Sequence, residues 1–217
     1  MSDGKSILVD TSKCTACRGC QVACKQWHGL PAEKTKQMGT YQNPQDLSVQ
    51  TWKLVRFSEG IKDNGKPYWL FFSEQCRHCL EPPCADSIGG YAPEGVVHDK
   101  ATGAVIFTQK SKEAPFEEVR EACPYKIPRK DPKTGVLAKC TMCLDRISNN
   151  KAPACVQTCP TSALVFGDRK DILAMAKKRV EELKKTYTKA MALNPDDVRV
   201  IYIVVEDPKK YHEFAVA

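Results

Sequence analysis

The chain has 217 residues, of which 42% are hydrophobic and 27% charged, and its formal net charge is +7. That length suits one or two domains and can bury a core without disulfides, which argues against a small disulfide-stapled scaffold. Residues 1–5 contain no apolar stretch of the signal-peptide type, and the longest aliphatic run, residues 201–205, is short. We therefore expect no signal peptide and no membrane span.

The N-terminal part combines a short strand, a cysteine loop and a short helix. Residues 6–10 predict the strand, and residues 21–27 the helix that follows the loop. Residues 30–48 are rich in polar side chains, proline and glycine, and predict an irregular surface insertion. The cysteines between strand and helix have the spacing C-x2-C-x2-C-x3-C: Cys14, Cys17, Cys20 and Cys24. This spacing is the signature of iron–sulfur sites in bacterial ferredoxins.

The middle of the chain predicts two hairpins and a second cysteine group. Residues 51–57 and 68–72 are candidate strands around a turn at 62–65, and residues 96–98 and 104–107 flank a five-residue loop. The second cysteine group has the spacing C-x2-C-x4-C: Cys76, Cys79 and Cys84. Cys123, followed by Pro124, has the form of the end of a run whose beginning is missing.

The C-terminal part begins with a turn at 131–135 and a stretched cysteine group. This group reads C-x2-C-x11-C-x3-C, with an insertion from 144 to 154: Cys140, Cys143, Cys155 and Cys159. Residues 168–190 predict one long helix, capped by Asp168 and carrying an apolar stripe. Residues 199–205 predict a further strand, buried or at an edge.

The recurring cysteine groups predict an α+β fold of two ferredoxin-like modules, one inserted in the other, with a C-terminal helix and strand. The outer module would comprise residues 1–50 and 132–217 and hold two 4Fe–4S clusters. The inserted module would comprise residues 51–131 and hold one. Twelve cysteines, at four per cluster, supply ligands for three 4Fe–4S clusters in all.

Crossed ligation assigns the ligands. In two-cluster ferredoxins the fourth cysteine of each run binds the other cluster, because the helix after the loop carries it to the neighbouring cube. Three ligand sets follow, which we call A, B and C. Set A is Cys14, Cys17, Cys20 and Cys159; set B is Cys140, Cys143, Cys155 and Cys24; set C is Cys76, Cys79, Cys84 and Cys123.

Four ligand positions of the inserted module are vacant. By the same spacing they fall at Ile88, Glu113, Phe116 and Val119. Under crossed ligation these vacancies remove one complete cluster and leave set C intact. The three apolar residues would fill the vacated volume, whereas Glu113 would reach solvent, since a carboxylate does not suit a dry cavity. We expect the missing cluster to have been terminal.

Zinc is the main alternative, because Cys-x2-Cys pairs also build structural zinc sites. Those sites usually use two pairs per metal, so the triplet spacing and the Cys-Pro endings favour iron–sulfur clusters. The positive charge does not require nucleic acid as a partner. Each cluster with its four thiolates carries about −2, so three clusters would reduce the formal +7 to about +1.

The four-group layout resembles the iron–sulfur subunit of molybdenum or tungsten bis-pterin oxidoreductases. The resemblance is carried by CTACRGCQVACKQW, EQCRHCLEPPC, ACPYKIPR, KCTMCLDRI and PACVQTCPTSAL. Most members of that family have sixteen cysteines and four clusters. The departure to twelve, together with LPAE, NPQDLS and WLFFSEQCRHC, is similar to the small subunit of soluble formate dehydrogenases with three clusters.

The resemblance implies a heterodimer with a large catalytic Mo/W-bis-pterin subunit that oxidises formate or reduces carbon dioxide. This chain would catalyse no bond chemistry and would pass electrons to an external carrier, such as a multihaem cytochrome c. It implies a periplasmic location, reached by export with the large subunit, whereas composition alone would indicate the cytoplasm. Two other functions stay open: the electron-transfer subunit of a polysulfide, dimethyl sulfoxide or nitrate reductase, and a free-standing polyferredoxin.

Overall fold

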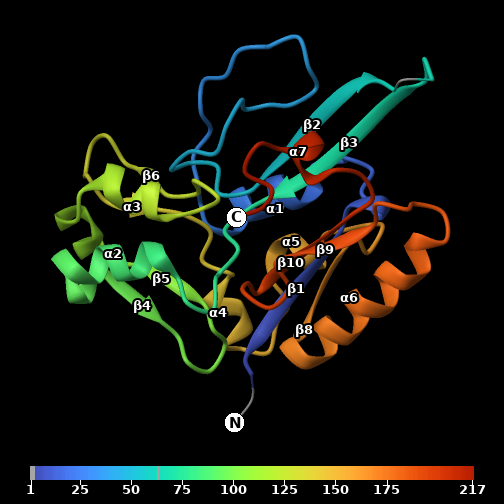
Figure 1. Ribbon diagram of the computed structural model, residues 1–217. Helices are drawn as coiled ribbons and strands as arrows, with labels where there is room; N and C mark the ends of the chain where they lie inside the picture. The colour runs from blue at the N-terminus through green and yellow to red at the C-terminus, as the bar shows by residue number, and fades with distance from the viewer. Residues whose placement is uncertain (1–2, 63) are drawn as a thin grey trace.

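The computed structural model describes residues 3–62 and 64–217. Its largest sheet has the strand order β8-β1-β10-β9 and runs through the centre of the molecule (Figure 1). The strands are β1 (Lys5–Asp10), β8 (Leu164–Asp168), β9 (Met191–Leu193) and β10 (Val200–Val204). β1 and β10 pair in parallel, and both outer strands pair antiparallel. The sheet thus unites the two ends of the chain.

β10 is buried along its whole length, because its residues VIYIV pack on both faces of the sheet. The prediction of a strand at 199–205 is confirmed, and its place is interior. The predicted strand at 6–10 is confirmed as β1, which begins one residue earlier. β9, which pairs with β10, was not predicted.

Helix α6 (Arg169–Lys184) covers one face of the sheet at the lower right of Figure 1. Its inward stripe contains Ile172, Ala176 and Leu183. The helix is six residues shorter at its C-terminal end than the predicted 168–190. Asp168 lies at the N-cap position, but its side chain makes no capping hydrogen bond and instead accepts one from Lys5 Nζ at 2.7 Å. The predicted position of Asp168 at the start of the helix is therefore correct, but the predicted capping hydrogen bond is absent.

The hairpin of β2 (Leu54–Ile61) and β3 (Pro67–Glu74) extends from the molecule at the upper right of Figure 1. Both strands are longer than predicted. The predicted turn at 62–65 includes Asp63, which lies outside the described residues. The base of the hairpin packs against α7 (Pro208–Tyr211), where the Tyr211 and Phe72 ring centroids are 6.1 Å apart.

Short elements form the rest of the fold, and the α2–β4–β5–α3 part lies opposite α6 (Figure 1). The helices are α1 (Gly19–Trp27), α2 (Pro83–Tyr91), α3 (Phe116–Ala122), α4 (Leu144–Ile147) and α5 (Ala154–Gln157). The strands are β4 (Val96–His98) paired with β5 (Val105–Phe107), and β6 (Arg129–Lys130) paired with β7 (Leu137–Ala138). The predicted α+β class is confirmed, and residues 30–47 contain neither helix nor strand, as expected.

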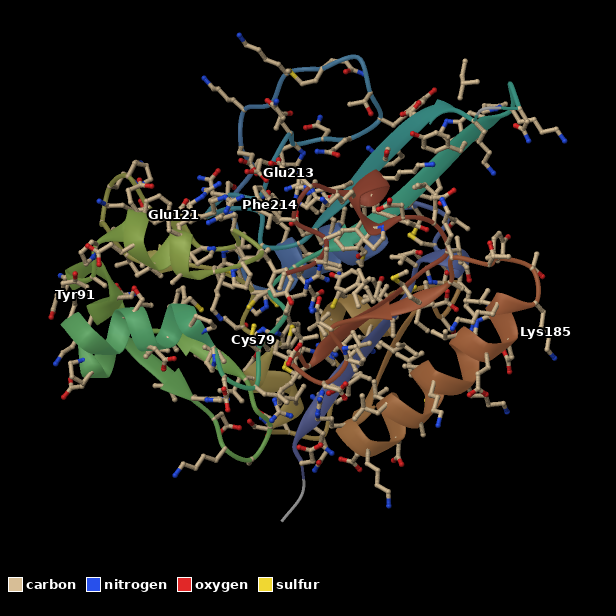
Figure 2. The ribbon with its side chains drawn as sticks, in the orientation of Figure 1. Cys79, Tyr91, Glu121, Lys185, Glu213 and Phe214 are labelled. Carbon is tan, nitrogen blue, oxygen red and sulfur yellow. The ribbon has the colours of Figure 1, made fainter. Side chains whose placement is uncertain are left out.

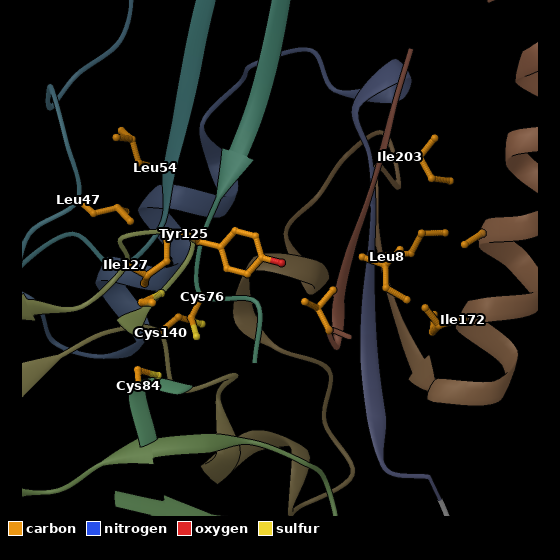
Figure 3. Close-up of a cluster of buried hydrophobic side chains, with 14 of the residues drawn as sticks. Leu8, Leu47, Leu54, Cys76, Cys84, Tyr125, Ile127, Cys140, Ile172 and Ile203 are labelled. Carbon is orange, nitrogen blue, oxygen red and sulfur yellow. The ribbon is translucent and has the colours of Figure 1, made fainter. Parts of the chain in front are cut away.

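The hydrophobic core is continuous across the predicted module boundary. Leu8 of β1, Leu54 of β2, Ile172 of α6 and the cysteines Cys76 and Cys84 belong to one cluster of buried side chains (Figure 3). The two parts of the chain therefore share one interior. Among the described residues, no helix combines the length and the apolar composition needed to cross a bilayer.

Candidate metal centres

Three of the four Cys-x2-Cys turns contain a non-glycine residue in the left-handed region at the second position between the cysteines. These residues are Ala16 (φ 54°), His78 (φ 48°) and Met142 (φ 57°). Such backbone is sterically costly for residues with a Cβ, so its recurrence indicates a shared structural demand. The turns aim backbone N–H groups at sulfur: His78 N lies 3.4 Å from Cys76 Sγ, and Met142 N lies 3.3 Å from Cys140 Sγ.

The two Cys-Pro endings also share one conformation. Lys126 and Ser162 each lie three residues after a cysteine, and each has φ of 51°. Burial would raise the pKa of the Cys159 thiol, but hydrogen bonds from the backbone of Leu164 and the side chain of Thr161 bring it below its usual value. N–H and O–H donors of this kind favour a thiolate, the form of cysteine that binds iron.

Three thiols of set A lie close together. Burial, followed by the nearby sulfurs of Cys20 and Cys159, raises the pKa of the Cys14 thiol. Cys20 is buried, whereas Cys14 and Cys159 are partly buried. Cys17 lies in the same loop but is exposed, and it marks the edge of set A at the protein surface.

Set B is assembled from three segments of the chain. Cys24 comes from α1, and its pKa is raised by burial and then by Cys155 and Cys143. Cys140 neighbours Cys24 and Cys143 in the same way. All four thiols are buried, with no more than 8% of any residue exposed. His28 adds its Nε2 atom 3.4 Å from Cys143 Sγ.

Set C gathers around the loop after β3. Burial, then Cys76 and Cys123, raises the pKa of Cys79 to about 12. Cys84 has the same neighbours. Figure 3 shows Cys76, Cys140 and Cys84 one below the other, with Tyr125 above Cys76. Cys79 is only partly buried, and Figure 2 shows it near the centre of that view.

The three sets are connected in the order A, B, C. Cys24 and Cys155 of set B neighbour Cys20 of set A. Cys140 of set B neighbours Cys76 of set C. Set B therefore occupies the middle, with set A and set C on either side, and these outer sets contain the thiols that are not fully buried.

Two buried lysines accompany the thiols, and sequence reasoning missed the role of the first. Lys53 is 2% exposed, and Lys139 is 5% exposed. Lys53 lies just before β2, on the inward face with Thr51 and Val55. The sequence does contain a signal for this role: Lys53 falls on the side of an alternating segment that is expected to face the core, where a lysine is unusual.

The vacant ligand positions lie where α2 meets α3. Ile88 and Val119 are fully buried, Phe116 is half-buried against the same core, and Glu113 is exposed, as expected. Apolar side chains occupy this volume instead of sulfur.

Buried N–H groups near the loops fit a sulfur-rich group. His78 Nδ1 accepts a hydrogen bond from Val105 N at 3.1 Å, which assigns the ring proton to Nε2. Within residues 3–62 and 64–217, neither His78 Nε2 nor Gln75 Nε2 has a hydrogen-bond partner. Cluster sulfur is an acceptor for such donors.

All twelve cysteines are free thiols. In the described part of the chain, no three His, Cys, Asp or Glu side chains converge tightly enough to hold one metal ion. A 4Fe–4S cube makes a different demand, because each of its four thiolates binds a different iron atom. The donor set of twelve sulfurs, all but Cys17 buried or half-buried and backed by N–H groups and cations, fits such clusters.

Comparison with known proteins agrees with this donor set. Residues 67–169 match the family model of a 4Fe–4S dicluster domain. The chain is 51% identical to formate dehydrogenase subunit beta of Megalodesulfovibrio gigas, over 98% of this chain and 99% of that protein. It is 49% identical to formate dehydrogenase 2 subunit beta (cytochrome c-553) of Nitratidesulfovibrio vulgaris, over 97% and 98%.

A third relative is the iron–sulfur subunit of the nitrate-inducible formate dehydrogenase of Escherichia coli. It is 38% identical over 94% of this chain and 70% of that protein. The chain belongs to the family of formate dehydrogenase beta, or iron–sulfur, subunits.

Proposed function

We propose that this chain is the electron-transfer subunit of a formate dehydrogenase and holds three 4Fe–4S clusters. The observation that carries the proposal is that thiols from distant cysteine runs are neighbours, as the sets require: Cys14 with Cys159, Cys24 with Cys143 and Cys155, and Cys79 with Cys123. Each 4Fe–4S cluster, when bound, accepts and releases one electron at a time. The chain itself performs no bond chemistry.

The residues of the chain hold, insulate and connect these sites. Set B is buried, so its neighbours are the other two sets rather than solvent. Sets A and C each have a thiol that reaches or approaches the surface, Cys17 and Cys79. We therefore assign the two surface-near sets to exchange with partners and set B to the connection between them.

One partner would be a large catalytic subunit with a molybdenum or tungsten bis-pterin site, in a heterodimer. The names of the relatives as beta subunits support this. The other would be a c-type cytochrome, since one relative is named for cytochrome c-553. We place the complex in the periplasm, exported with the large subunit.

The arrangement of modules belongs to the same proposal. Residues 1–50 and 132–217 would form the outer module with sets A and B, and residues 51–131 the inserted module with set C. Three of the four vacant positions lie on α2, which contains Cys84 of set C, and on α3, which ends just before Cys123, and Glu113 lies shortly before α3. We propose that the lost fourth site was terminal.

The function is tested on the complex with its catalytic subunit, under anaerobic conditions. Formate should bleach the broad cluster absorption near about 400 nm that belongs to this chain. The same chain without the catalytic subunit should bleach with dithionite but not with formate. Bleaching of the isolated chain by formate, or a colourless zinc-containing chain, would contradict the proposal.

Crossed ligation has its own test in Cys24→Ala. The proposal expects loss of the cluster of set B, although Cys24 belongs to the run of set A. The matched variant Cys20→Ala should instead damage the cluster of set A. Equal effects of both variants on one and the same cluster would refute the pairing.

A further inference from the structure

Lys53 is a buried cation with neutral hydrogen-bond partners. Its ammonium group donates to the backbone oxygen of Ser73 at 3.4 Å and to Gln75 Oε1. Among the residues that the structure describes, neither Lys53 nor Lys139 lies within ion-pairing distance of a carboxylate. A buried charge is costly unless an opposite charge compensates it, so another source of negative charge is needed.

The thiols of sets A and B supply that negative charge for Lys53. Burial alone would lower the pKa of Lys53, but the sulfurs of Cys155 and Cys20 raise it above its usual value. Ser73 connects the lysine directly to set A, because its hydroxyl lies 3.3 Å from Cys20 Sγ while its carbonyl accepts from Lys53 Nζ. The lysine therefore stands beside two neighbouring sets at once.

Lys139 has a corresponding position between sets B and C, since it directly precedes Cys140 in the sequence and its ammonium group lies 3.4 Å from the backbone oxygen of Cys140. Its ammonium group donates to the backbone oxygen of Val105 and lies 4.6 Å from the centroid of the Phe107 ring. Its charge lowers the pKa of the Cys84 and Cys123 thiols, against the larger raising effect of burial. Sets A and B thus share one buried cation, and sets B and C share another.

We infer that Lys53 and Lys139 are positioning residues that raise the reduction potentials of the clusters, Lys53 for sets A and B and Lys139 for sets B and C. Reduction adds negative charge to a site that is already negative. A fixed cation nearby stabilises the reduced form more than the oxidised form, so the potential rises. The inference deepens the proposed function and rests on it.

The test is an anaerobic redox titration, followed by electron paramagnetic resonance, of the complex with its catalytic subunit. Lys53→Gln removes the charge and keeps an N–H donor for Ser73 and Gln75. It should shift the one-electron equilibrium of clusters A and B by about tenfold, or about 59 mV, to lower potential, and that of cluster C much less. Lys53→Arg should leave all three potentials near those of the wild type.

Lys139→Gln is the matched variant, and it should shift clusters B and C more than cluster A. Signals are assigned by their loss in Cys24→Ala and Cys123→Ala. Unchanged potentials in both glutamine variants, or the same shift of all clusters in each, would overturn the inference. So would an arginine variant that shifts as far as the glutamine variant.

Cluster assembly provides a second readout if Lys53→Gln does not load sets A and B. Loading restored by Lys53→Arg supports the charge, whereas failure of both variants contradicts it. Failure of the proposed function would appear differently, as a wild-type complex without iron–sulfur signals. Wild-type signals that formate reduces, combined with unchanged variant potentials, would refute the role of the lysines alone.

Discussion

The Cys24 side chain belongs to the first cysteine run, yet its sulfur neighbours those of Cys143 and Cys155, more than a hundred residues later in the chain. Helix α1 makes this possible, because it begins at Gly19 and carries the side chain away from its own loop. The proposed ligand set of a cysteine therefore depends on its neighbours in space and not only on the run to which it belongs in the sequence. The cysteine spacing predicts this set only if the fourth cysteine of each run is assigned to the other cluster.

Cys123→Ala tests set C at this scale. All four cysteines of set C come from the proposed inserted module, and none comes from the runs of sets A and B. The variant should therefore lose one cluster, or about four iron atoms, and keep the other two. Iron and labile-sulfide analysis of the purified complex measures the loss. Ser87→Ala, a change beside Ile88 on α2, should keep all the iron. Loss of two clusters, or of none, in Cys123→Ala would refute the assignment.

The buried carboxyl of Glu74 should make the stability of the protein depend on pH. Burial would raise its pKa, but His212 and Arg56 hold the pKa of this carboxyl below its usual value. The contacts are 2.5 Å to Arg56 and 3.2 Å to His212. Because the folded-state pKa is depressed, this contribution to stability is present above the ordinary value of 4.5 and is lost as the pH falls through the folded-state pKa.

Glu74→Gln should therefore destabilise the protein by roughly 2 kcal/mol near neutral pH, because it removes the buried carboxylate that pairs with Arg56 and His212, while Arg56 keeps Asp46 as a second partner. The difference from the wild type should shrink as the pH falls below the ordinary value of 4.5 and through the folded-state pKa. Urea unfolding of freshly prepared anaerobic samples measures both. The exposed Glu181→Gln of α6 serves as the control and should match the wild type throughout. A difference that grows on acidification would contradict the account.

At the scale of elements, α6 is tied to the sheet by a single stripe. Ile172 is 1% exposed and Met175 is 45% exposed, although the two lie three residues apart on the same helix. Ile172→Ala should cost about 2–5 kcal/mol through lost burial and a cavity, whereas Met175→Ala should cost about 0.5 kcal/mol or less. Urea midpoints of the two variants measure this. Equal midpoints would mean that α6 does not depend on this contact.

Several strands were predictable from the sequence, whereas α2 and α5, which carry Cys84 and Cys155, were not predicted. The strand at 6–10, the hairpin at 96–107 and the strand at 199–205 follow from local alternation and turn residues. The end of α6 does not. Thr186 and Tyr187 are weak helix formers, and Tyr187 N closes the last turn onto Leu183 O before the chain enters β9.

Long-range placement accounts for the other differences. β9 is three residues long and exists because β10 offers it an edge, a partner that local sequence cannot show. In the sequence Lys53 looks like an ordinary strand lysine. Its burial depends on contacts with β3 and with the sulfurs of sets A and B, which are distant in the sequence. Asp168 meets the helix-cap rule in sequence, yet Lys5 on the paired strand β1 binds its carboxylate.

At the scale of the whole molecule, the two ends of the chain meet in one sheet while the middle of the chain forms the far side. β1 and β10 lie in parallel at the centre, and α2 and α3 lie opposite α6 (Figure 1). The thiol sets lie between these parts, in the order A, B, C. In this order, set B is the neighbour of both other sets.

The central claim is that this chain holds three clusters and no fourth. Native mass spectrometry of the anaerobic complex, with the subunits separated in the gas phase, measures the clusters on this chain alone. The account predicts a mass increase equal to three 4Fe–4S clusters, or about twelve iron and twelve sulfide atoms. An increase equal to two or four clusters, or to zinc ions, would contradict it.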